Sequence, residues 1–279
     1  MKIAFFSKDG DSGVTSNMSA ISIAGILGFN MRILAMENHW SQDSMARYLM
    51  YENGPNIIKE GELHYLGRGM VESMVMHFSD YTKKRRTDPY TIEVIQNSLY
   101  YLPQNAYSKD VFDYEFCSNV LPRMKALEKT YDIILIDTKN YTMNSRVILD
   151  EADLVVVNLK QDLDDIEAFF YYYSSITYKS LFLISNYRTK KPCNLNKIRT
   201  QFNIRKESIA SVSHNLQFEN ALHQGKVINY MYDYFHCPKG DFNYRFIRDI
   251  KNATEMILKN AKEMDNVTEE YLNSGLIGG

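Results

Sequence analysis

The chain has 279 residues, of which 45% are hydrophobic and 24% are charged, and its formal net charge is −2. This composition is typical of a soluble globular protein, and the near-zero charge gives no reason to expect non-specific DNA binding through the overall field. The three cysteines form no C-x-x-C pair, which favours a reducing compartment over a disulfide framework or a cysteine-ligated metal. No apolar run approaches the roughly 20 residues of a membrane span and no signal peptide precedes the first strand, so we expect a cytoplasmic protein without an integral membrane segment.

Short apolar runs alternate with segments of helical periodicity, which is the order of βαβ units. The unbroken runs at 133–136 and 154–157 favour strands buried on both faces. We therefore predict an α/β fold with a doubly wound, mostly parallel sheet and helices on both faces. Strands are predicted at residues 2–6, 32–36, 98–102, 132–136, 154–158 and 180–185, with a shorter one near 209–212. Helices are predicted at residues 15–27, 114–129, 162–178, 194–202, 217–224 and 244–265.

No linker rich in Pro, Gly or Ser divides the chain, so we predict one domain over residues 1–265 and a flexible tail at 266–279. The region 41–97 is the hardest to interpret. Met70 and Met74 in it lie at helical spacing, and Lys83-Lys84-Arg85-Arg86 marks an exposed loop. These basic residues are candidates for contact with DNA phosphates, although four without a wider stripe are more typical of a solvated loop.

The segment between the first strand and the first helix is built like a phosphate-binding loop. Set against the pattern G-x-x-x-x-G-K-[ST], Gly13 takes the last glycine and Thr15 the magnesium-binding hydroxyl. Val14 stands where the lysine belongs, and Lys8 stands where the first glycine belongs. The plainer alternative is a strand–helix turn capped by Thr15 or Ser16. The candidate nucleotide-binding residues of this loop are Lys8, Asp9, Gly10, Asp11, Ser12, Gly13, Val14, Thr15 and Ser16.

A second element supports the phosphate-loop interpretation. The segment 131–138 contains an apolar run, 133–136, that is followed by Asp137, as in a Walker B strand. In an open parallel sheet, ligands bind beyond the carboxyl ends of the strands, so Asp137 should lie near the loop. Thr15 and Asp137 are therefore the candidate Mg²⁺ residues. The alternative is an aspartate that merely ends a strand.

With these segments in order, the chain resembles the deviant-Walker P-loop ATPases that include MinD, ParA and the pilus-positioning protein TadZ, also called CpaE. Lys8 or Asp9 occupies the region of that family's early lysine, which reaches across a dimer to the partner's nucleotide. Asn186 ends a strand whose terminal Asn reads the adenine edge in the family. The resemblance implies a P-loop NTPase fold of the SIMIBI class, ATP or ADP with Mg²⁺ as cofactors, and a homodimer.

Departures from the family pattern concern catalysis. Val14 cannot replace the lysine that contacts the β- and γ-phosphates, so we expect hydrolysis to be weak or absent. Glu37 takes the first acidic position after the second strand, and His39 takes the position of the carboxylate that orients water. His39 is a candidate base, but a lone loop histidine is more often incidental. TadZ-like members also lack the loop lysine and are the nearest resemblance.

Three function classes follow from the resemblance. The first is a positioning or assembly factor for a pilus, secretion, conjugation or partition apparatus, which dimerises with or without nucleotide. The second is a working ParA-type ATPase that cycles on DNA, and the third is a bacterial tyrosine kinase. The kinase ranks last because its relatives carry a tyrosine cluster in the C-terminal tail, where this chain has only Tyr271. Whether the chain is an enzyme stays open.

Overall fold

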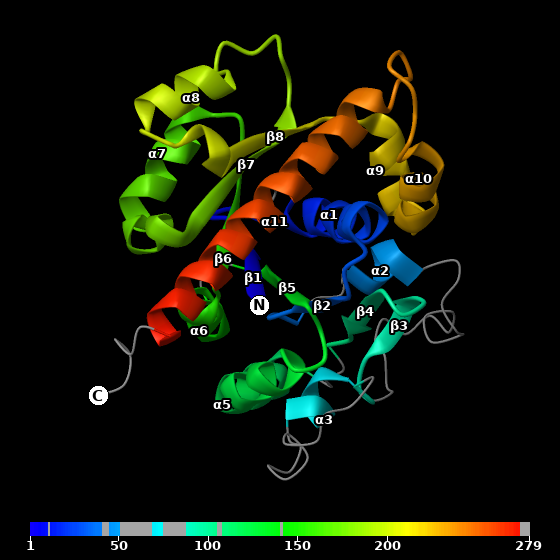
Figure 1. Cartoon of the computed structure of the whole chain (residues 1–279), viewed down its shortest axis with the longest axis vertical. Helices are drawn as coiled ribbons and strands as arrows, with labels where there is room; N and C mark the ends of the chain where they lie inside the picture. The colour runs from blue at the N-terminus through cyan, green and yellow to red at the C-terminus, as the bar shows by residue number, and fades with distance from the viewer. Residues whose placement is uncertain are drawn as a thin grey trace.

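The computed structural model describes residues 1–10, 12–40, 45–50, 69–74, 88–104, 108–139 and 142–273. Its strands form one eight-stranded sheet in the order β3-β4-β2-β5-β1-β6-β7-β8 (Figure 1). They are β1 (Lys2–Phe6), β2 (Ile33–Glu37), β3 (Ile92–Ile95), β4 (Leu99–Leu102), β5 (Ile133–Thr138), β6 (Leu154–Leu159), β7 (Ser180–Tyr187) and β8 (Ile209–Ser213). Neighbouring strands are parallel except for β3 and β4. The predicted doubly wound, mostly parallel sheet is confirmed.

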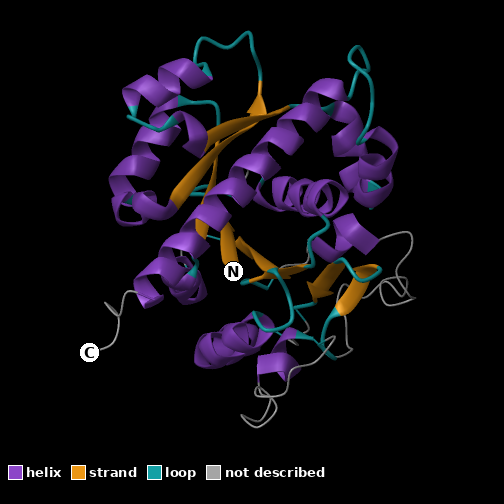
Figure 2. Ribbon diagram, in the orientation of Figure 1, coloured by secondary structure: helices purple, strands orange, loops and turns teal. Residues whose placement is uncertain are grey.

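Alternate side chains of each strand enter two separate apolar layers. Ile3 and Phe5 belong to one layer, and Ala4 and Phe6 belong to the other, as expected for strands buried on both faces. The helices of the first layer are α1 (Val14–Phe29), α2 (Met45–Met50), α9 (Leu216–His223), α10 (Val227–Tyr234) and α11 (Tyr244–Asn273). Those of the second are α3 (Met70–Met74), α5 (Lys109–Leu127), α6 (Met143–Glu151), α7 (Leu163–Tyr172) and α8 (Leu195–Gln201). Helices thus cover both faces (Figure 2).

The centre of the sheet is the place where the strand order reverses. β1 lies between β5 and β6, and the chain leaves β1 toward β2 on one side and later crosses to β6 on the other. Asp137 pairs with Phe5 of β1 and with Glu37 of β2 in the parallel register. Because residues at the same register of parallel strands point to the same face, Glu37 and Asp137 lie side by side at the carboxyl edge. This edge is where ligands bind in doubly wound sheets.

Several predicted helix boundaries are wrong. The helix expected at 162–178 ends at Tyr172, and a 3₁₀ helix (Ser174–Lys179) follows, because this turn redirects the chain so that Ile176 is buried. The last helix continues to Asn273 instead of ending near 265, so the first part of the expected tail is helical. Residues 274–279 of that tail lie outside the described residues.

The short elements β3, α2, α6 and α10 were not predicted. Each is four to nine residues long, and elements this short give only a weak periodic signal. In α6 the local cap is the deciding feature, since the Thr142 side chain accepts a hydrogen bond from the Ser145 N–H. The basic run 83–86 lies outside the described residues, so DNA contact there stays a prediction.

The apolar residues of α3 and α11 are buried. Met70 and Met74 are 0% and 1% exposed, so both fill the core. In α11, which crosses the sheet beside α1 (Figure 1), the apolar stripe is also covered. Its members are Ile247, Ile250, Ala253, Ile257 and Ala261. Among the helices of the described ranges, none is both long enough and apolar enough to cross a membrane.

Candidate functional site

The loop between β1 and α1 ends in a left-handed glycine. Gly13 has φ of 72°, a conformation that side chains disfavour, and it is the N-cap of α1. No side chain caps this helix end in the described part of the chain. The first N–H groups of a helix have no partner within it, and Asn17 is the first α1 residue whose N–H reaches back, to the Gly13 carbonyl at 2.9 Å. The helix start therefore presents free donors, as an anion site requires.

Thr15 joins this helix start to the end of β5. Its hydroxyl donates a hydrogen bond to Oδ2 of Asp137, a carboxylate that is only 2% exposed. The two candidate Mg²⁺ residues, 122 positions apart in the sequence, are therefore in direct contact. The Thr15 side chain therefore does not cap α1, which argues against a strand–helix turn capped by Thr15. Ser16 does not cap α1 either: its hydroxyl donates to the Gly13 carbonyl at 3.0 Å.

Lys8 is held by carboxylates of its own chain. Its Nζ lies 2.9 Å from Oδ2 of Asp9 and 3.4 Å from Oδ1 of Asp165, in the first turn of α7. The hydrogen bond to Asp9 is the main cause that raises the pKa of Lys8, and Asp165 adds to it. Burial raises the pKa of Asp165. Lys8 therefore does not point away from the protein, as a lysine reaching for a partner's nucleotide would.

The rest of the loop is anchored through small polar contacts. Ser12 is 2% exposed and donates to the Asp9 carbonyl at 3.2 Å, while Gly10 is exposed. Val14 is buried in the apolar layer on the α1 side of the sheet. Asp11 lies outside the described residues.

A buried amide network, which the sequence did not predict, locks α1 to the neighbouring strands. Asn17 Nδ2 donates to Asn158 Oδ1 of β6 at 2.8 Å and to Ser185 Oγ of β7 at 2.9 Å. The sequence signal for this network was the polar Asn158 near the end of a strand otherwise made of Leu and Val. Asn186 follows Ser185 with φ of 49° and an exposed side chain. The described contacts do not join Asn186 to the loop, so its adenine role stays a prediction.

Next to Asp137 lies a buried group of three ionisable side chains. Glu37, His39 and Asp137 each offer a ligand atom within 4.8 Å of the others, and they are 0%, 6% and 2% exposed. Tyr101 donates to Glu37 Oε2 at 2.6 Å, and the Met45 N–H donates to Oε1 at 3.1 Å. His39 Nε2 lies 3.8 Å from Glu37 Oε1, and the buried His39 Nδ1 has no hydrogen-bond partner among the residues that the structure describes.

Burial governs the ionisation of this group. It raises the pKa of Glu37 to about 7, with a further contribution from the charge of Asp137, and it raises the pKa of Asp137 to about 6. Burial and the charge of Lys139 lower the pKa of His39 to about 3. His39 is therefore neutral at physiological pH and forms no ion pair with Glu37. A base with so low a pKa is also poorly suited to activating water near pH 7.

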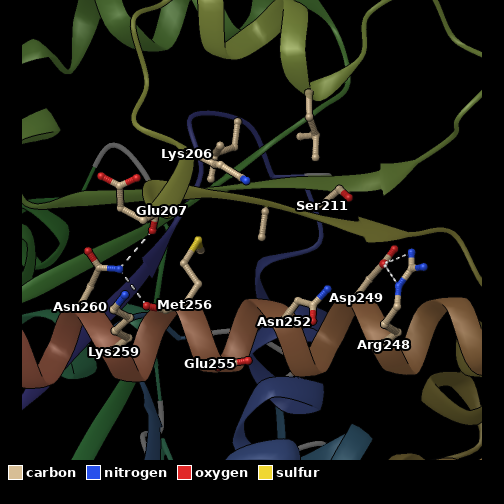
Figure 3. A pocket seen from close by; sticks show the side chains of 13 residues that line it. Lys206, Glu207, Ser211, Arg248, Asp249, Asn252, Glu255, Met256, Lys259 and Asn260 are labelled. Carbon is tan, nitrogen blue, oxygen red and sulfur yellow. Dashed lines mark hydrogen bonds and ion pairs between the residues drawn. The ribbon is translucent and has the colours of Figure 1, made fainter.

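A separate groove of about 530 Å³ lies at the β8 edge, between that strand and α11 (Figure 3). Some of its polar groups are paired within the chain: Arg248 Nη2 lies 2.9 Å from Asp249 Oδ1, and Asn260 donates to the Glu207 carbonyl at 3.2 Å. β8 is separated from β1 by β6 and β7, so this groove is not part of the loop site.

The overall fold of the chain is similar to those of solved MinD and ParA structures. MinD from Pyrococcus horikoshii in complex with Mg-ADP superposes with a TM-score of 0.68 at 13% identity, over 94% of this chain and 98% of its own. The chain has the MinD/ParA fold. A ParA family ATPase from Chlorobium tepidum gives a TM-score of 0.65 at 12% identity, over 91% of this chain and 98% of its own.

A third structure with the MinD/ParA fold is a putative plasmid partition protein from Borrelia burgdorferi bound to AMPPNP. Its TM-score is 0.58 at 17% identity, over 92% of this chain and 98% of its own. No protein-family model and no curated protein sequence matches the chain. The likeness is therefore one of fold, at identities too low to carry function by themselves.

Proposed function

We propose that this protein is a degenerate MinD/ParA-like P-loop protein that positions or assembles a larger apparatus, and that it binds nucleotide weakly and hydrolyses it slowly or not at all. The observation that carries the proposal is the contact between the Thr15 hydroxyl and the Asp137 carboxylate, beside an uncapped helix start behind Gly13. A turn that only joined a strand to a helix would need neither the Thr15–Asp137 hydrogen bond nor an uncapped helix start. The structural neighbours with Mg-ADP and AMPPNP support the same ligand class.

The residues present fit a Mg²⁺–nucleotide only in part. Free N–H groups at the start of α1 suit phosphate oxygens, and a side chain on Gly13 would bring a Cβ to 3.2 Å from Ser16 Oγ. Thr15 and Asp137 would hold Mg²⁺, which supplies charge neutralisation at the phosphates when bound. Asn186 is the proposed adenine contact.

The charge that stabilises phosphoryl transfer is missing from the loop. Phosphoryl transfer depends on positioning and on cations placed at the transferred group. Val14 supplies no charge, and Lys8 is engaged by Asp9 and Asp165. Asp9 and Asp11 add negative charge to a loop that should receive an anion. Binding without rapid turnover follows from this combination.

The proposed assembly is a homodimer that recruits protein components of a pilus, secretion, conjugation or partition system. Its support is the resemblance to MinD, ParA and TadZ-like proteins together with the shared fold. In a dimer formed across the loop, Lys8 would have to leave Asp165 before it could reach the partner's nucleotide. The Lys8–Asp165 contact therefore favours the monomer when nucleotide is absent.

Calorimetric titration of the protein with ATP–Mg²⁺ and with ADP, alongside light scattering for mass and a phosphate-release assay, tests the proposal. We expect weak binding, an increase in mass with nucleotide and no phosphate release above an Asp137→Asn control. Tight binding with release that Asp137→Asn abolishes would instead favour a working ParA-type ATPase. No binding and no change of mass up to millimolar nucleotide would contradict a nucleotide-dependent switch and leave a nucleotide-independent scaffold.

A further inference from the structure

Of the group formed by Glu37, His39 and Asp137, only Asp137 has a role in the nucleotide-binding proposal, in which it would hold Mg²⁺ with Thr15. The group nevertheless places three ionisable side chains in contact range in the interior, which the end of a strand does not require. All three side chains are at least nine-tenths buried, and they come from the ends of two adjacent strands. Buried ionisable groups are costly unless they are paired or coordinate a metal. The burial of these three groups must therefore be offset by favourable interactions.

Hydrogen bonds within the chain provide some of these interactions. Glu37 receives the Tyr101 hydroxyl and the Met45 N–H, and Asp137 receives the Thr15 hydroxyl. None of these donors carries a charge, and the positive charge that acts on Asp137 is that of Lys139. Among the described residues, the buried His39 Nδ1 has no hydrogen-bond partner, although buried polar atoms are almost always hydrogen-bonded. A cation held by the two carboxylates and one nitrogen of His39 would place a positive charge directly between these side chains.

We propose that Glu37, His39 and Asp137 bind one divalent transition-metal ion, for which Zn²⁺ is the best probe. Two carboxylate oxygens and one imidazole nitrogen make a three-ligand set with room for a fourth, as in zinc sites that keep an open position. Imidazole suits Zn²⁺, Fe²⁺ and Ni²⁺, whereas Mg²⁺ prefers an all-oxygen shell with several waters. The mixed donor set therefore selects against Mg²⁺.

The ligand atoms lie near the spacing that this ion needs, although somewhat farther apart. A tetrahedral ion with bonds of about 2.1 Å holds its ligand atoms roughly 3.4 Å apart. His39 Nε2 and Glu37 Oε1 are 3.8 Å apart, and the three ligand atoms all lie within 4.8 Å of one another. Side-chain movements of about 1 Å or less would complete the site, which is within ordinary torsional freedom.

The surrounding hydrogen bonds resemble the support that metal ligands receive in known sites. Ligating carboxylates are usually oriented by a further hydrogen bond, and loss of such a partner weakens metal binding by about 10–100-fold. Tyr101 does this for Glu37 from β4, and Thr15 does it for Asp137 from α1. The two carboxylates are thus oriented by two separate elements of the fold, β4 and α1.

The experiment is a calorimetric titration of Zn²⁺ into protein freed of metal with a chelator, without nucleotide and with millimolar Mg²⁺ present. We expect one Zn²⁺ per chain, a loss of at least about 100-fold in affinity for His39→Ala, and a loss of about tenfold or more for Tyr101→Phe. His223→Ala, which removes an exposed histidine, should bind as the wild type does. Tyr101→Phe keeps the ring and so remains informative if His39→Ala fails to fold.

Unchanged Zn²⁺ affinity in both variants would overturn the proposal, because the ion would then be held elsewhere, for example at Cys117. Displacement of Zn²⁺ by millimolar Mg²⁺ would also overturn it, since it would indicate an all-oxygen site. The nucleotide proposal fails separately, through absence of nucleotide binding in a protein whose Zn²⁺ affinity is intact.

Discussion

The β1–α1 loop and the carboxyl ends of β2 and β5 meet at Thr15 and Asp137, yet the two regions differ in the groups that they bring to this edge of the sheet. The loop contributes the left-handed backbone of Gly13 and the uncharged side chain of Val14. The strand ends contribute two buried carboxylates, Glu37 and Asp137, and the imidazole of His39. The loop offers backbone donors, which suit an anion, whereas the strand ends offer side-chain ligands, which suit a cation. The difference teaches that neighbouring parts of one sheet edge can suit ligands of opposite charge.

The largest expected effect in this comparison belongs to Glu37. Its raised folded-state pKa means that the folded protein holds a proton that the unfolded chain has already released above about pH 4.5. Stability from this group is therefore greatest at low pH and is lost as the pH rises to about 7. Glu37→Gln should remove this loss. In a chelator-containing buffer, its unfolding free energy relative to the wild type should rise by roughly 3 kcal/mol between pH 4.5 and 8, at about 1.4 kcal/mol per pKa unit.

Denaturant unfolding at several pH values measures this difference, with Glu167→Gln as the matched control because Glu167 is exposed. The control should show the same pH dependence as the wild type. A Glu37→Gln difference that stays constant with pH would mean that Glu37 is not the buried, costly acid described above.

A smaller effect is expected in the loop at Gly13. Its left-handed φ of 72° disfavours any side chain, and an added Cβ would lie 3.2 Å from Ser16 Oγ. Gly13→Ala should therefore lower the unfolding free energy by about 1–2 kcal/mol. Gly10→Ala is the control, because its Cβ meets nothing within 4 Å, and it should change stability by less than about 0.5 kcal/mol. Equal effects at both positions would show that the loop does not need the special backbone of Gly13.

The smallest effect is expected for the Lys8–Asp165 contact. Both side chains are partly shielded, at 18% and 11% exposed, so a double-mutant cycle with Lys8→Met and Asp165→Asn should give a coupling of about 0.5–1 kcal/mol. The Arg146–Asp150 pair, at 3.9 Å with 80% and 67% exposure, is a suitable control and should couple by less than about 0.5 kcal/mol. Equal coupling in the two cycles would remove the argument that Lys8 is restrained.

The sequence predicted those strands of the fold that are continuous apolar runs. The strands ending in Phe6, Asp137 and Asn158 were recognisable because buried parallel strands are continuous and apolar. Their common carboxyl edge followed from the sheet topology, and it brought Thr15 and Asp137 together as expected. The antiparallel strand β3 was not predicted, because it is short and mostly half-exposed and so has no continuous apolar run.

Contacts between side chains far apart in the sequence were beyond prediction. Asn17 meets Asn158 and Ser185 only after α1 has docked on the sheet, and nothing local to Asn17 indicates those partners. Likewise, the pairing of Lys8 with Asp165 depends on where α7 begins relative to the loop. Such contacts depend on tertiary packing, and the pattern of residues in a single sequence does not indicate them.

We propose that residues 8–16 form a phosphate cradle whose main deficit is the missing lysine, and the most direct test is the affinity of Val14→Lys for ATP–Mg²⁺ compared with the wild type. Val14→Met is the matched control, because it lengthens the side chain without adding charge. We predict that Val14→Lys binds at least about tenfold more tightly, an interaction of about 1.4 kcal/mol, and that Val14→Met binds as weakly as the wild type. Equal affinity in all three proteins would contradict the claim, since it would mean that residues 8–16 are not a phosphate cradle.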